Sequence, residues 1–354
     1  MHDLKNAEHA THMKIIIGKN LSERVRVTVG ADYFTTKFDE DFKENAGNAF
    51  SSGYDNNIAA AYAETDIFFS KNFAAKAGLR FSHSDLLQES NLSPRLSLAY
   101  KVSKNGQFSL AYGDFVQSPR QEYLKYSSQF ESEKTAHYIL NFQYNKTGKT
   151  FRAEAYFKQY RDLVKYDTEI SQFDSQFNNN GKGFAKGIDL FWRDNNSFKN
   201  LEYWISYSYI DTERDYKNYP KQVTPSFVAD HSLSIVTKYW ISDLRSQVGF
   251  TNSFNSGRPY NNPNESAFMN GKTKAYNNLS FSWAYLVSQQ KILYFSVSNV
   301  LGTDNVFGYQ YADNPNMNGE FQRQAIRQPA DRFFFVGFFW TISENKKENQ
   351  LKNL

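Results

Sequence analysis

The sequence predicts an all-β chain folded as an antiparallel β-barrel, and three features of its 354 residues lead to that prediction. Apolar and polar residues alternate with a period of two in segment after segment, as in strands with one dry and one wet face. No segment sustains the roughly 3.6-residue period of an amphipathic helix. Short and long connections alternate along the chain, which is typical of a meander with tight turns at one end and long loops at the other.

The segment LEYWISYSYI (201–210) shows the alternation clearly. Its odd-numbered positions are apolar or aromatic, and Glu202, Ser206 and Ser208 lie between them. Three further segments repeat the pattern, so their apolar residues are assigned to one face of a strand. These residues are Phe151, Ala153, Ala155, Phe157, Phe227, Ala229, Leu233, Ile235, Leu279, Phe281, Trp283 and Tyr285.

Fifteen segments carry this strand signal. Short connections such as Lys146–Lys149 alternate with long ones such as Gly302–Pro329, and only Asp85–Ser93 is shorter than its place in the alternation requires. A sandwich with Greek-key crossings is not expected to alternate so regularly. The predicted strands lie near residues 12–18, 23–37, 55–70, 73–84, 94–103, 107–117, 132–145, 150–166, 183–194, 201–212, 227–241, 244–256, 273–287, 291–301 and 330–342.

The composition indicates a barrel that spans a membrane. Aromatic residues make up 17% of the chain, although its mean hydropathy is −0.67. No apolar run approaches the ~18 residues of a transmembrane helix, whereas most predicted strands reach the ~9–11 residues that cross a bilayer as tilted strands. Lipid offers no partner to backbone amides, so such strands close into a barrel. A lipid-facing cation costs about 2–4 kcal/mol at mid-bilayer, so Arg152, Glu154 and Lys158 are expected to point inward.

The tryptophans are expected at one edge of the membrane. Trp192, Trp204, Trp240 and Trp340 lie a few residues from short-turn ends, and Trp283 is slightly further away. Because Trp and Tyr gather at bilayer interfaces, these residues predict a girdle on the periplasmic side. Trp204 and Trp240 fall on the face assigned inward.

Few residues suggest chemistry. The chain has no Cys, which excludes disulfides, thiolate metal sites and a Cys nucleophile. Its net charge of +4 comes from well-mixed acids and bases, which gives no argument for nucleic acid. His9 and His12 could share a metal only on a helix, and the loop Asp167–Lys182 lacks regular calcium-ligand spacing. No Ser–His pair can be placed, so an enzyme, a cofactor and a metal site are not expected.

Several segments together resemble the TonB-dependent outer-membrane receptors. The resemblance covers essentially the whole chain and consists of strand patterns rather than a catalytic signature. The segments are DFVQSPRQEYLKY, ESEKTAHYILNFQYN with FRAEAYFKQYRDLVKY, GFAKGIDLFW, TPSFVADHSLSIVTKYW, SGRPYNNPN, FSVSNVLGTDNVFGYQYA and the terminal RFFFVGFFWTI.

This resemblance implies a barrel of about 22 strands with an N-terminal plug. Residues 1–342 are then expected to form the last fifteen strands, and residues 343–354 a polar periplasmic tail. An odd strand count with a periplasmic C-terminus implies that an odd number of strands precedes Met1. The plug, the TonB box and a secretory signal are therefore expected upstream.

The terminal RFFFVGFFWTI is expected to be the closing strand of this barrel. Phe333, Phe335 and Phe339 are its predicted closing-strand residues, with lipid on the outward face. Phe334, Val336 and Phe338 have no assigned partner.

The function expected from the resemblance is TonB-dependent import of a scarce nutrient complex, namely a siderophore, metal chelate, cobalamin or glycan, across the outer membrane of a Gram-negative bacterium. The expected partners are outer-membrane lipid, the plug and TonB. A passive porin or structural barrel, and a secreted β-rich binding protein, are the alternatives. Aromatic and cationic residues in the outer loops are the predicted ligand-binding residues: Tyr123, Tyr126, Arg258, Tyr260, Tyr309 and Tyr311.

Overall fold

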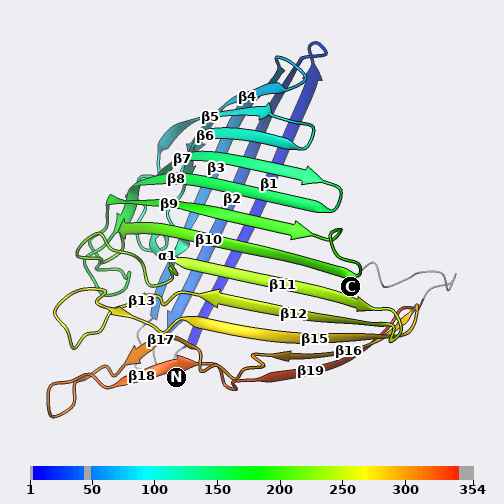
Figure 1. Cartoon of the computed structure of the whole chain (residues 1–354). Coiled ribbons are helices and arrows are strands. Elements are labelled where there is room, and N and C mark those ends of the chain that lie inside the picture. The colour runs from blue at the N-terminus through cyan, green and yellow to red at the C-terminus, as the bar shows by residue number, and fades with distance from the viewer. Residues whose placement is uncertain (1–2, 44–48, 343–354) are drawn as a thin grey trace. The chain divides into compact units, whose positions relative to one another are not determined.

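The computed structural model describes residues 3–43 and 49–342 (Figure 1). The predicted polar tail, residues 343–354, lies outside the described residues. Nearly all of the regular structure is β-strand, as predicted. The helix α1 (Gln121–Leu124) has four residues, and among the described residues no helix is long and apolar enough to cross a membrane.

The described residues form one antiparallel sheet of fifteen strands, which confirms the predicted strand count. Each strand pairs with the next strand of the sheet along the chain, as a meander requires. The strands are β1 (Asp3–Asn20), β2 (Val25–Lys43), β3 (Ala49–Phe68), β4 (Phe73–Ser84), β5 (Glu89–Lys101), β6 (Gly106–Gln117), β7 (Glu133–Lys146), β8 (Lys149–Lys165), β9 (Asn178–Asp194), β10 (Leu201–Asp215), β11 (His231–Ile241), β12 (Ser246–Asn255), β15 (Tyr276–Ser288), β16 (Lys291–Ser298) and β19 (Phe333–Trp340).

The chain divides into two compact units. Unit 1 contains β1 to β6, α1 and the loop-side ends of β7 to β10. Unit 2 contains the turn-side ends of β7 to β10 and everything from β11 onward. Each unit has a small buried cluster, around Tyr123 and Val164 in unit 1 and around Ala284 and Ile292 in unit 2.

Strand pairing in unit 2 separates an apolar face from a polar one. Tyr203, Thr237, Phe250, Phe281 and Val297 face one another across five neighbouring strands. On the other face, Ser206, Ser234, Ser253 and Asn278 face one another across four of these strands. Because paired residues share a face and the side-chain period is two, the alternation predicted from the sequence is present in the register.

The same separation holds in unit 1. Ile17, Val29, Ala63, Leu79 and Pro94 form one series across β1 to β5. The next series, one position along each strand, contains Glu64, Gly78 and Arg95 and therefore carries charge. The apolar series is largely exposed, whereas charged side chains gather on the opposite face.

Several strand boundaries differ from the sequence prediction, and two of the differences change which residues lie on a strand face. β1 begins at Asp3 rather than near residue 12, because its polar first half pairs with β2 along its whole length. β11 begins at His231, so Phe227 and Ala229 lie in a loop and not on a strand face. The loops also contain two short hairpins that the alternation did not indicate: β13 (Pro259–Tyr260) with β14 (Gly271–Lys272), and β17 (Val306–Tyr311) with β18 (Arg323–Arg327).

The pairing of the last strand, β19, shows which of its residues continue the apolar face. Phe334 pairs with Val297 and Val336 with Phe295, so both continue the apolar face of unit 2. Phe335 and Phe339 lie on the opposite face, where their rings contact Tyr294 at centroid distances of 6.1 and 6.4 Å. Phe333 pairs with Ser298 and shares the face of Phe335. Apolar residues occupy both faces of this strand, so the sequence pattern could not show which one continues the apolar surface.

Asn299 fastens the loop that leads from β16 to β19. Its side chain is 1% exposed, and its Nδ2 donates to the carbonyl oxygens of Thr303 and Asp331, both at 2.8 Å. Its Oδ1 accepts from the Thr303 amide at 3.0 Å. The backbone φ of Asn299 is +50°, a left-handed conformation that Asn tolerates better than most residues. Both the hydrogen bonds and the left-handed backbone conformation therefore favour Asn at this position of the SVSNVLG segment.

We expect Asn299→Ala to lower the free energy of unfolding by about 2–4 kcal/mol, because it leaves buried carbonyl and amide groups unpaired at a left-handed position. The control is Asn314→Ala in the same loop, where the side chain is exposed; its effect should stay within about 0.5 kcal/mol. Urea unfolding in detergent micelles measures both. Equal effects of the two substitutions would contradict the structural role of Asn299.

Candidate functional site

A network of charged side chains lies on the polar face of unit 1. Asp32 of β2 is almost buried and accepts hydrogen bonds from Arg80 Nη1 at 2.6 Å and from His12 Nε2 at 3.1 Å. The register brings these groups together, because Asp32 pairs with Lys14 on one side and Gly30 pairs with Tyr62, which in turn pairs with Arg80. A carboxylate this deep is stabilised only by such partners.

Tyr62 lies across Gly30 in the middle of this network. A Cβ on residue 30 would come within 2.4 Å of the Tyr62 ring, so a larger residue there would displace the ring. Lys14 Nζ and Arg80 Cζ each lie 5.8 Å from the centre of the ring, within the range of cation–π attraction. The ring therefore holds two cations on the wall of the sheet.

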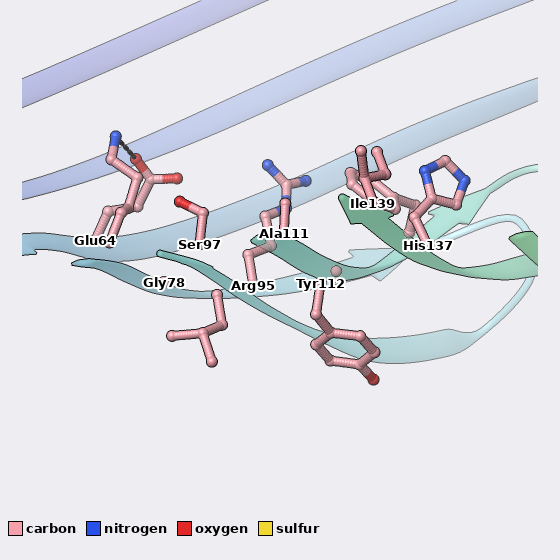
Figure 2. Close-up of a pocket in the computed structure, with 12 residues that line it drawn as sticks. Glu64, Gly78, Arg95, Ser97, Ala111, Tyr112, His137 and Ile139 are labelled. Atoms are coloured by element: carbon pink, nitrogen blue, oxygen red, sulfur yellow. Dashed lines mark ion pairs between the residues drawn. The ribbon is translucent and has the colours of Figure 1, made fainter. Parts of the chain in front are cut away.

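A cavity of about 270 Å³ lies beside this network (Figure 2). Figure 2 shows Glu64, Arg95, Ser97 and His137 projecting to one side of the strands, while Tyr112 projects to the other. Glu64 is paired with Lys76 at 3.5 Å. Arg95 has an aromatic neighbour instead, since its Cζ lies 4.8 Å from the centre of the Phe115 ring.

Three further cavities continue along the same face of unit 1. Their volumes are about 220, 260 and 330 Å³. Neighbouring cavities share lining residues: Arg95 links the first two, Arg80 links the next, and Val116 leads to the largest cavity at the loop end. In that largest cavity, the Arg214 guanidinium lies 4.6 Å from the Tyr160 ring. The polar face of unit 1 is thus a continuous hollowed wall of mixed charge.

The predicted ligand residues Tyr123 and Tyr126 belong to the loop platform above this wall. Tyr123 is 3% exposed and packs against Tyr166 and Phe177, so burial raises the pKa of its hydroxyl. One edge of Tyr123 lines the largest cavity. Tyr126 is half-buried, with its ring edge-on to Phe173 at 4.8 Å. Tyr123 therefore supports the platform, while Tyr126 remains partly accessible.

A salt bridge joins this platform to a neighbouring loop end. Lys125 Nζ donates to Glu40 Oε1 at 2.6 Å. Burial alone would lower the pKa of Lys125, but its hydrogen bond to Glu40 raises that pKa above its usual value. The ammonium group is therefore charged, and it ties α1 to the end of β2.

In unit 2 the structure brings together three of the other predicted ligand residues. The rings of Tyr260 and Tyr309 lie 4.7 Å apart. The Arg323 guanidinium lies 4.4 Å from the centre of the Tyr309 ring and donates to Tyr260 Oη at 3.2 Å. Tyr311 lies on the same hairpin, and its burial raises the pKa of its hydroxyl. We call Tyr260, Tyr309, Tyr311 and Arg323 the loop cluster.

The two hairpins that carry the loop cluster are joined directly. Asn264 Oδ1 accepts from the Phe321 amide at 2.7 Å, and Asn264 Nδ2 donates to the Phe321 carbonyl at 3.0 Å. Tyr260 also lies over Gly271, where a Cβ would come within 2.4 Å of its ring. The cluster is therefore held in place by the backbone. Arg258 lies nearby and contributes a backbone amide that donates to Thr273 Oγ1 at 2.9 Å, rather than a side-chain contact to the cluster.

Sequence reasoning missed Arg323 and the Asp32 network. Arg323 lies in a long polar loop without a pattern, and only the hairpin places it beside Tyr309. Asp32, His12 and Arg80 lie on three different strands, and each appears as an ordinary polar position of the alternation. Their positions could have been found only by aligning the strand registers.

The structure places the residues of the two metal sites that the sequence analysis considered. His9 and His12 lie on a strand three residues apart, so they point to opposite faces. In the 167–182 loop, Asp167 accepts from the Gln176 amide at 2.8 Å. Within the part of the chain that is described, no group of three His, Cys, Asp or Glu residues could hold a metal ion.

Comparison with known families identifies the class of protein. Residues 4–300 match the family described as TonB dependent receptor-like, beta-barrel. The chain therefore belongs to the TonB-dependent receptor β-barrel family, as the sequence resemblance predicted. No curated protein matches it by sequence.

Solved structures agree with this fold. The ferric yersiniabactin uptake receptor FyuA from Yersinia pestis is 14% identical with a TM-score of 0.73; the match covers 95% of this chain and 54% of FyuA. The FrpB iron transporter from Neisseria meningitidis is 13% identical with a TM-score of 0.70, covering 95% and 55%. The outer membrane transporter YddB from Escherichia coli is 11% identical with a TM-score of 0.68, covering 96% and 54%. The chain thus spans just over half the length of these proteins.

We predict that Phe281→Arg prevents stable insertion into the membrane, whereas Ser282→Arg is tolerated. Phe281 continues the apolar face and contacts the Phe250 ring at 5.3 Å, so a cation there meets lipid at a cost of about 2–4 kcal/mol. Ser282 is its immediate neighbour on the polar face. The amount of folded protein in outer-membrane fractions, judged by heat-modifiable gel mobility, measures both. Equal losses for the two variants would refute the assignment of faces.

Proposed function

We propose that this chain forms barrel wall and outer loops of a receptor that imports a scarce nutrient complex across the outer membrane with energy from TonB. The observation that carries the proposal is the two-faced sheet of a TonB-dependent receptor family member, whose polar face in unit 1 is a hollowed wall of paired charges. In this proposal the wall contacts a plug and borders the route of the substrate. Outer-membrane lipid covers the apolar face, and Trp192, Trp283 and Trp340 lie at its periplasmic edge.

A ferric siderophore is the first substrate class to test. The names of two structural neighbours describe a ferric yersiniabactin uptake receptor and an iron transporter. At this low sequence identity the similarity supports the fold and not the substrate. Uptake of metal chelates, cobalamin and glycans is therefore tested alongside uptake of siderophores. Family membership does not support a passive porin, and the proposed role is transport without catalysis.

The loop cluster is the proposed ligand-binding site. Tyr260, Tyr309 and Tyr311 offer ring faces and hydroxyls, and Arg323 offers a charge that is already oriented by stacking on Tyr309. Such a preorganised group loses little freedom when it binds a ligand. Tyr126 and Arg258, both half-buried in outer loops, are secondary candidates, and Tyr123 would act through the platform that it supports.

Deletion of the gene in its native host tests the transport role. We expect the mutant to lose uptake of at least one radioactive iron–siderophore complex under iron limitation. Restoring the intact gene should restore uptake, and removing TonB or the proton-motive force should abolish it again. Uptake that continues without TonB would contradict the proposal and favour a passive pore. Unchanged uptake of every siderophore, with loss of cobalamin or glycan uptake, would change the substrate class.

Arg323→Gln should weaken binding of the transported complex by about tenfold, because it removes a charge and an oriented donor while leaving the hairpin backbone in place. The control is Arg327→Gln on the same strand, whose guanidinium is paired with Asp304 at 2.8 and 3.1 Å. Ligand titration of the complete receptor in detergent measures both dissociation constants. Equal affinities of wild type and Arg323→Gln would remove the loop cluster from the ligand site.

A further inference from the structure

The turn edge of each unit is strongly basic. We define the turn edge as the short turns together with the two strand residues on either side. In unit 1 it holds six Lys or Arg residues and a single carboxylate, Glu23. The six cations are Lys19, Arg24, Arg26, Lys71, Lys101 and Lys104, and all six are exposed.

The turn edge of unit 2 also has more Lys and Arg residues than carboxylates. It carries six cations and three carboxylates. Two of the carboxylates are paired within the turn edge: Asp194 with Lys149 at 3.6 Å, and Glu202 with Arg193. Within the described part of the chain, the four other cations form no ion pair: Lys146, Lys199, Arg245 and Lys291. The only remaining carboxylate in this turn edge is Asp243.

The longest loop at the other ends of the strands does not share this excess of cations. Loop 302–332 carries Asp304, Asp313, Glu320 and Asp331 against three arginines. Positive charge is therefore concentrated where the strands turn and not spread evenly over the chain, whose formal net charge is only +4.

Large apolar side chains are interleaved with these cations. In unit 1, Phe69 is 53% exposed two residues from Lys71, and Val102 is exposed beside Lys101. In unit 2, the exposed side chains of Phe198 and Leu244 adjoin Lys199 and Arg245 in the same way. Lys291 Nζ lies 4.7 Å from the centre of the exposed Trp340 ring. Single exposed apolar residues are ordinary, but a repeated pairing with a cation calls for a common explanation.

We propose that the turn edge binds anionic phospholipid headgroups in the periplasmic leaflet, with phosphate as the recognised group. Apolar and aromatic side chains at a strand end lie in the boundary between acyl chains and headgroups, and neighbouring Lys and Arg reach the phosphates. The turn edge continues the apolar face that family membership places against lipid, which favours a lipid surface over an acidic protein. This inference depends on the membrane position and not on which nutrient is transported.

The test compares lipid retention by the complete receptor in detergent. Native mass spectrometry is used with equal amounts of phosphatidylglycerol and phosphatidylcholine. We expect wild type to retain phosphatidylglycerol preferentially. The triple variant Lys71→Gln, Lys104→Gln, Lys199→Gln should reduce this preference by at least about tenfold, since each cation near an anionic surface strengthens attraction several-fold. The matched control changes three exposed lysines away from the turn edge, Lys182→Gln on the loop-side half of β9 together with Lys221→Gln and Lys274→Gln in loops, and should keep the preference.

Three results would overturn the proposal. These are equal retention of both lipids by wild type, an unchanged preference in the turn variant, and an equal loss in the control. If the turn variant does not fold, wild type alone decides: raising the salt to about 0.5 M should remove the preference, and a preference that persists would contradict a headgroup-charge mechanism. Equal lipid retention would leave an acidic periplasmic protein as the partner. Nutrient uptake can fail in the earlier experiment while this lipid preference remains, so the two proposals fail separately.

Discussion

The structure depends on one constraint. The backbone N–H and C=O groups of the strands must pair with those of neighbouring strands, while the two faces of the sheet meet different environments. Hydrogen-bonded pairing fixes the register, and the register determines which residues share a face. From β10 to β19 the result is an apolar series through Phe250, Phe281 and Val297, with serines on the other face. In unit 1 the same register places Asp32, Arg80 and Arg95 on one face of the sheet. The chain belongs to a family of outer-membrane receptors, and the membrane position that we propose gives this sorting a physical reason: one face would meet lipid and the other would be free to carry charge.

Much of the fold could be predicted from the sequence because the signal is local. Alternation within a strand needs only the residues of that strand, so all fifteen strands and the Phe281 and Ser282 faces could be inferred without a structure. The prediction failed where local information is ambiguous. Phe227 and Ala229 continue the alternation of the next strand, yet they precede its first hydrogen-bonded pair. The closing strand is apolar on both faces, so only its pairing with β16 could show that Phe334 and not Phe335 continues the apolar surface.

The sequence could indicate some of the residues of the candidate site, but not how they are arranged in space. Aromatic residues in the outer loops indicated Tyr260 and Tyr309, and the structure places their rings in contact, but it adds Arg323 from the far side of a hairpin. Tyr123 looked like an exposed loop aromatic, whereas it is the buried centre of a platform. The Asp32 network could not be foreseen, because it forms only when three registers coincide. Long-range pairing is therefore the information that the sequence pattern lacked.

The central claim is that the sheet separates a lipid-facing side from a polar side with a period of two. The chain has no Cys, so single cysteines introduced at each position of β15 report one site at a time. A fluorescent probe on each cysteine, quenched by a lipid-dissolved quencher in reconstituted receptor, measures contact with lipid directly. Strong quenching at positions 279, 281, 283 and 285 with weak quenching at 280, 282 and 284 is the predicted result. Uniform quenching along the strand, or the opposite alternation, would contradict the account.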